Sequence, residues 1–160
     1  LYYTGMREGE LLALTPADID LERKEIRINK SYQRLNKEDV ITAPKTPKSV
    51  RTITIPDKLC VCLKEYIDMC YELKLNDRLF PYTKYFIYNE IEKGSKAAGV
   101  KRIRAHDIRH SHASLLIEMG FSPLLIAERL GHEKVQTTLD TYSHLYPNKQ
   151  AEVAKKLDDV

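Results

Sequence analysis

Apolar and polar residues alternate along the first third of the chain. Segment 8–14 has a helical pattern that stops before Pro16, because the residue before a proline avoids the helical region. Segments 25–30 and 50–55 place isoleucines between charged or polar residues, which predicts strands. A weaker strand is predicted at 39–43. We expect these three strands to form a small antiparallel sheet.

The rest of the chain follows a helical period. Apolar residues recur at a spacing of three to four from Leu59 to Cys70, so this face is expected to be buried. Ser122 and Pro123 provide an N-cap and a first-turn proline for a later helix. The further helices are predicted at 85–98, 106–119, 124–130, 137–141 and 149–157. The sequence therefore predicts an α+β fold that is mainly helical with a small antiparallel three-stranded sheet.

Length and composition indicate one folded domain. The chain has 160 residues, 42% hydrophobic and 31% charged, which suits a folded domain with its own core. No apolar run approaches the roughly 20 residues needed to span a bilayer, and no signal peptide pattern opens the chain. We expect a cytoplasmic protein without a membrane partner. The three cysteines, Cys60, Cys62 and Cys70, lack zinc-like spacing and are expected to be reduced thiols.

Positive charge is concentrated locally. The net charge of +3 allows a nucleic-acid partner without requiring one. Lys45, Lys48 and Arg51 form one basic cluster, and residues 101–104 contain another. Each cluster fits an ordinary solvated loop as well as a DNA-binding surface.

One short segment predicts phosphate chemistry. His106 and Arg109 are three residues apart, so both project from the same face of a helix. Arginine offers a planar fork of donors to a phosphate, and histidine adds a donor or a base. This pair alone would also fit a solvated helix face. Arg7, His132 and Tyr142 lie at other points of the chain and change this interpretation.

These residues occur in motifs whose order resembles the tyrosine recombinases of the phage integrase family, especially integrases of phages and conjugative transposons. The motifs are Thr4-Gly5-Met6-Arg7, Pro44-Lys45-Thr46, His106-Asp107-Ile108-Arg109, Leu130-Gly131-His132 and Thr141-Tyr142-Ser143-His144. The resemblance implies six catalytic residues, which are Arg7, Lys45, His106, Arg109, His132 and Tyr142. It also implies that Glu10 supports Arg7.

The resemblance implies cleavage and rejoining of DNA through a 3′-phosphotyrosine at Tyr142. The arginines and histidines would stabilise charge on the phosphate without a metal ion, and no ATP or other cofactor is expected. His106 or His132 could serve as the base for the phenol. Lys45 is the expected proton donor to the leaving 5′ oxygen. Lys48 and Arg51 are expected to contact DNA phosphates, with Lys48 as the alternative acid.

The resemblance also implies a longer protein. Residues 1–160 are expected to be a catalytic domain, with an N-terminal DNA-binding domain and the first catalytic-domain helix lying before Leu1. The expected partner is double-stranded DNA. The chain is expected to be a monomer alone and a tetramer on DNA, with accessory DNA-bending proteins as possible partners. Segment 149–160 is a candidate for exchange between neighbours, and docking in cis or in trans remains open.

Two other functions fit parts of the sequence. Segment 117–132 resembles the helix-turn-helix of a transcription regulator, which would not need Arg7, Lys45 or Tyr142. A type IB topoisomerase would share the chemistry but relax supercoils without partner subunits. The target DNA sequence and the direction of recombination are not encoded in these motifs.

Overall fold

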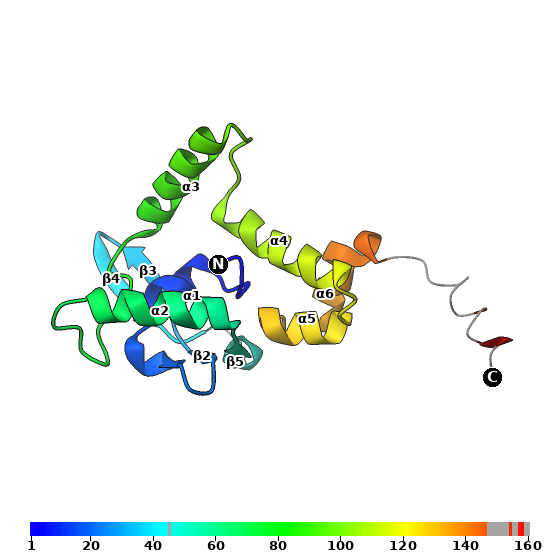
Figure 1. The fold of residues 1–160 in the computed structure, drawn as a ribbon, viewed down its shortest axis with the longest axis horizontal. Coiled ribbons are helices and arrows are strands. Elements are labelled where there is room, and N and C mark those ends of the chain that lie inside the picture. The colour runs from blue at the N-terminus through cyan, green and yellow to red at the C-terminus, as the bar shows by residue number, and fades with distance from the viewer. Residues whose placement is uncertain (45, 147–153, 155–156, 159–160) are drawn as a thin grey trace.

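The computed structural model describes residues 1–44, 46–146, 154, 157 and 158. The strands, α1 and α2 occupy one side of the molecule, and α4, α5 and α6 occupy the other (Figure 1). Helix α3 projects away from both groups and leads into α4. Among the described residues no helix is long and apolar enough to cross a membrane.

The three-stranded sheet is antiparallel, in the order β1-β2-β5, as predicted for its size and type. Its strands are β1 (Ile19–Asp20), β2 (Glu25–Ile28) and β5 (Arg51–Thr54). Ile26 pairs with Ile53, and the alternation that predicted the strands buries both. Helix α2 (Asp57–Met69) adds Leu63 to the same core, so the predicted buried face of this helix is confirmed.

The prediction that strand 39–43 belongs to this sheet is wrong. The strand exists as β4 (Glu38–Thr42), but it pairs with β3 (Ser31–Leu35) in a separate two-stranded hairpin. Asn36 and Lys37 both have positive φ in the turn, which suits a two-residue hairpin loop. β1 supplies the third strand of the main sheet instead. With two residues, β1 is too short for an alternation pattern to reveal it.

Most predicted helices are confirmed within two residues. The structure forms α1 (Glu8–Ala13), α3 (Lys84–Ala98), α4 (Ala105–Glu118), α5 (Pro123–Leu130) and α6 (Val135–Tyr142). Ser122 accepts a hydrogen bond from the Leu125 amide, which confirms the predicted N-cap of α5. Three short 3-10 helices add η1 (Pro16–Asp18), η2 (Pro47–Ser49) and η3 (Ser143–Leu145). The predicted helix at 149–157 lies almost entirely outside the described residues.

A second core holds α4, α5 and α6 together. It consists of Ala113 and Ile117 from α4, Ile126 and Leu130 from α5, and Tyr142 from α6. The predicted glycine at the end of α5, Gly131, has φ of 68°, a conformation that favours glycine. Packing in this core therefore fixes where the ring of Tyr142 lies.

Gly131→Ala and Gly94→Ala should shift stability in opposite directions. Alanine at 131 would be held at positive φ, and its Cβ would lie 2.8 Å from a guanidinium nitrogen of Arg51. We expect a loss of about 1–2 kcal/mol or more. Gly94 is helical with open space around it, so alanine there should add about 0.5–1 kcal/mol. Urea unfolding measures both, and a stable Gly131→Ala variant would contradict the packing described.

Candidate active site

Arg109 is fixed in the interior by backbone carbonyls. Its side chain comes from α4, and the residue is only 3% exposed. One terminal nitrogen donates to the carbonyl oxygen of Gly5 and the other to that of Leu130, at 2.7 Å. Burial, and then the charges of Arg7 and Arg51, lower the pKa of Arg109 to about 9. The guanidinium therefore stays cationic at neutral pH, and its position is set by the fold.

Glu10 supports Arg7, as the sequence predicted. Arg7 is the N-cap of α1, and its amide and guanidinium donate to the two carboxylate oxygens of Glu10, at 2.8 and 2.9 Å. Glu10 is 3% exposed, whereas the Arg7 side chain remains 42% exposed. This pair differs from an ordinary surface bridge because its acidic partner is buried. The guanidinium of Arg7 is held in place and still accessible.

Arg51 is a structural residue, so the expectation that it contacts DNA phosphates is wrong. Its side chain is 7% exposed and donates to both oxygens of Glu10, at 3.0 and 3.1 Å. Its Nε donates to the carbonyl oxygen of Arg129, which ties β5 to α5. Lys48 is exposed in η2, in line with its expected role at the surface. Lys45 lies outside the described residues.

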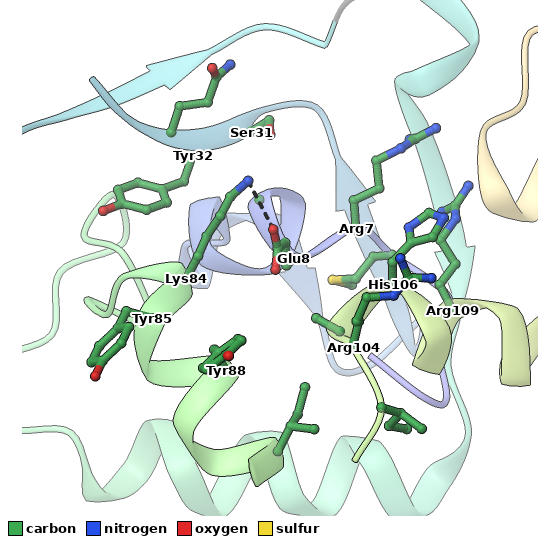
Figure 2. A pocket seen from close by; sticks show the side chains of 16 residues that line it. Arg7, Glu8, Ser31, Tyr32, Lys84, Tyr85, Tyr88, Arg104, His106 and Arg109 are labelled. Atoms are coloured by element: carbon green, nitrogen blue, oxygen red, sulfur yellow. Dashed lines mark ion pairs between the residues drawn. The ribbon is translucent and has the colours of Figure 1, made fainter. Parts of the chain in front are cut away.

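Arg7, His106 and Arg109 line one cavity of about 920 Å³, which we call the cation pocket. Figure 2 shows these three side chains gathered at one end of it. Between this group and Tyr85, Lys84 of α3 forms an ion pair with Glu8, at 3.0 Å. Burial, and then the neighbouring positive groups, lower the pKa of His106. A concave site with Arg7, His106 and Arg109 together at one end is suited to an anion such as a phosphate.

His132 lies beside the cation pocket without lining it. Its Nδ1 forms a hydrogen bond with the hydroxyl of Thr138, at 2.8 Å. Burial, and then the charges of Arg109, Arg7 and Arg51, lower the pKa of His132 to about 4. His132 is therefore neutral at pH 7.

Tyr142 is buried, at 4% exposure, and also does not line the pocket. Its hydroxyl forms a hydrogen bond with Nδ1 of His110, at 2.6 Å. Burial raises the pKa of Tyr142, and the charge of Arg109 offsets part of this effect. The phenol is therefore protonated at neutral pH and needs an acceptor before it can act as a nucleophile.

Three residues at this site were missed from the sequence. No pattern in the sequence indicated that Thr138 would contact a site residue. Arg51 belonged to a cluster that was expected to be exposed. His110 could have been noticed, because it lies four residues after His106 on the same helical face. Among the described residues no group of three or more histidines, cysteines or carboxylates could hold a metal ion.

Comparison with known proteins identifies the family of the chain. Residues 1–149 match the sequence profile of the phage integrase family. The chain belongs to the phage integrase family. The resemblance to tyrosine recombinase catalytic domains is thereby confirmed, and so is the predicted fold class.

Several members of the phage integrase family align with nearly all of this chain. The ICEBs1 integrase of Bacillus subtilis (strain 168) is 42% identical over 99% of this chain and 47% of its own length. A XerC-like tyrosine recombinase of Caldanaerobacter subterraneus subsp. tengcongensis is 30% identical over 98% of this chain and 47% of its own length. The chain thus spans about half the length of these relatives.

Solved structures show the same fold. The Tn1549 transposon integrase, in complex with a circular intermediate DNA, superposes with a TM-score of 0.78 at 20% identity, over all of this chain and 56% of its own. The XerA recombinase superposes with a TM-score of 0.65 at 26% identity, over 92% of this chain and 56% of its own.

Glu10→Gln should destabilise the protein strongly, because it leaves the buried charge of Arg51 without a counter-charge. We expect a loss of about 3–5 kcal/mol in the free energy of unfolding. Asp68→Asn, which breaks the exposed pair with Lys64, is the matched control and should change nothing measurable. Urea unfolding at neutral pH measures both, and equal effects would contradict a structural role for the Glu10–Arg51 pair.

The same variant should alter the acid dependence of stability. Burial alone would raise the pKa of Glu10, but hydrogen bonds and charges from Arg51 and Arg7 bring it below the ordinary 4.5. A lowered folded-state pKa gives stability that is complete above the unfolded-state value and is lost as pH falls through the folded-state value. The wild type should lose this contribution below about pH 4.5, and Glu10→Gln should not.

Proposed function

We propose that this chain is the catalytic part of a site-specific DNA recombinase, which cleaves and rejoins duplex DNA through a 3′-phosphotyrosine at Tyr142. One observation carries the proposal: Arg7, His106 and Arg109 line a single pocket, and the charge of Arg109 also reaches Tyr142. Membership of the phage integrase family supports it. So does a fold shared with a transposon integrase solved with DNA.

The cation pocket would bind the scissile phosphate. Negative charge develops on the non-bridging oxygens as the phosphate is attacked, and fixed donors stabilise it without reorganising. Arg109 suits this task because two backbone carbonyls hold it before any ligand arrives. Arg7 suits it because Glu10 holds its accessible guanidinium. These side chains would supply the charge stabilisation that a metal ion provides in other phosphoryl-transfer enzymes, and the phosphotyrosine would conserve the bond energy without ATP.

The remaining assignments follow the family pattern. His132 would add a neutral imidazole beside the phosphate, since its pKa lies well below neutral pH. Lys45 would protonate the leaving 5′ oxygen, because an alkoxide is a poor leaving group.

The proposed assembly is a monomer that becomes a tetramer on two DNA sites, with accessory DNA-bending proteins where the site requires them. A DNA-binding domain would precede residues 1–160, and segment 149–160 would dock on the chain itself or a neighbour. DNA in the cytoplasm would be the substrate.

Tyr142→Phe should abolish covalent attachment to DNA and leave DNA binding intact, because it removes only the hydroxyl. The full-length protein is mixed with duplexes that tile the DNA flanking its own gene, and adducts are resolved on denaturing gels. Tyr146→Phe is the matched control, since Tyr146 packs against the same core and should keep the adduct. An adduct that persists in Tyr142→Phe and disappears in Tyr146→Phe would assign the nucleophile to Tyr146. No adduct from the wild type would favour a DNA-binding regulator.

Lys45→Ala should cleave normal DNA about 100-fold or more slowly and recover on DNA with a 5′-bridging sulfur. A thiolate, whose conjugate thiol has a pKa of about 8.5, is a good leaving group without a proton donor, whereas an alkoxide is not. Arg7→Ala is the control that should stay slow on both substrates, because its role concerns the non-bridging oxygens. Arg7 serves better than Arg109, whose removal would also unpair two buried carbonyls. Rescue of Lys48→Ala in place of Lys45→Ala would assign the acid to Lys48.

A further inference from the structure

His110 contacts the proposed nucleophile directly. It lies on α4, and its Nδ1 is 2.6 Å from the hydroxyl of Tyr142. The two rings are 5.6 Å apart, centroid to centroid, at an angle of 62°. Among the described residues this is the one hydrogen bond that the Tyr142 hydroxyl makes. The contact is therefore well formed, and none of the family motifs assigns it.

The two histidines expected to serve as the base have other contacts. His132 uses its Nδ1 on the Thr138 hydroxyl. His106 lines the cation pocket and packs edge-on against His110, with ring centroids 4.6 Å apart. Of these three imidazoles, only that of His110 has a nitrogen at hydrogen-bond distance from the phenol.

Packing holds Tyr142 in this contact. Its ring is part of the core formed by α4, α5 and α6, and this packing restricts the positions that its hydroxyl can reach. His110 is half-buried, which leaves its ring a route for exchange of the proton with solvent. A nucleophile fixed by packing next to a nitrogen with access to solvent is arranged for proton transfer.

We propose that His110 is the proton acceptor for Tyr142 during strand cleavage, an inference that rests on the proposed recombinase function. Nδ1 of neutral His110 accepts the phenol proton, and the Tyr142 oxygen forms a bond to phosphorus. The bond from phosphorus to the 5′ oxygen breaks, and the leaving oxygen takes a proton from the acid assigned to Lys45. In rejoining, the 5′ hydroxyl gives its proton back to the group assigned to Lys45 and its oxygen forms a bond to phosphorus. The bond from phosphorus to the Tyr142 oxygen breaks, and His110 returns its proton to that oxygen.

The groups around His110 are compatible with this cycle. Tyr142 of α6 contacts His110. On α4, His106 and Asp107 are near enough to interact electrostatically with His110. The carboxylate of Asp107 is bound by Arg104 and stays ionised.

His110→Asn separates proton acceptance from positioning. An asparagine amide can still form a hydrogen bond with the phenol from near the position of Nδ1, but it cannot take a proton. The full-length protein is tested on nicked duplexes that tile the DNA flanking its own gene, with the rate of adduct formation as the readout. We expect His110→Asn and His110→Ala to bind DNA like the wild type and to react about 100-fold or more slowly. Added imidazole should partly restore His110→Ala and leave His110→Asn slow.

Ser111→Ala is the matched control, because Ser111 is an exposed neighbour that bonds only to the backbone of its own helix, and it should react at the wild-type rate. A wild-type rate in His110→Asn would overturn the proposal. A slow His110→Ala beside it would leave His110 a positioning role, and a wild-type rate in both variants would leave it none. Failure of imidazole to restore a DNA-binding His110→Ala variant would also overturn it. If the wild type itself forms no adduct while Tyr142→Phe behaves identically, the recombinase function fails instead.

Discussion

One buried carboxylate, that of Glu10, balances a concentration of positive charge on which the site depends. It accepts hydrogen bonds from both Arg7 and Arg51, and Arg109 adds a third guanidinium nearby. Placing three cations, of which Arg51 and Arg109 are buried, beside one anion is costly unless each charge has partners. Arg51 also reaches the Arg129 carbonyl, and Arg109 reaches those of Gly5 and Leu130. The same bonds that satisfy these charges hold the start of α1, the sheet and the end of α5 together.

The excess of positive charge suits the site to an anionic ligand. After burial, which is the largest cause, it lowers the pKa of His132 to about 4 and the pKa of His106 below its ordinary value. It also favours any anion that enters the cation pocket, because a phosphate would supply the missing counter-charge. Binding of DNA would therefore relieve an unfavourable concentration of charge that folding alone leaves in place.

Sequence reasoning predicted most of the fold because its signals were local. The cap at Ser122, the glycine at 131 and the isoleucine alternation at 26 and 53 each act within a few residues. Its errors came from long-range contacts. Arg51 looked like a surface residue until β5 packed against α5, and strand 39–43 was assigned to the wrong sheet because its partner, β3, carries no clear alternation. Motif order supplied the proposed site residues, whereas the contact between His110 and Tyr142 depends on how α4 and α6 pack.

The groups proposed to bind the phosphate and the proposed nucleophile come from different elements. Arg7, His106 and Arg109 come from the start of α1 and from α4, whereas Tyr142 comes from α6 and does not line their pocket. Helix α5 connects the two, since its last carbonyl binds Arg109 and its apolar face packs against Tyr142. Because the phenol is buried and protonated, attack requires the phosphate and the Tyr142 hydroxyl to approach each other while a base remains within reach. The proposed acceptor, His110, lies on α4, the helix that also carries His106 and Arg109, so its spacing to these two groups is set by a single element.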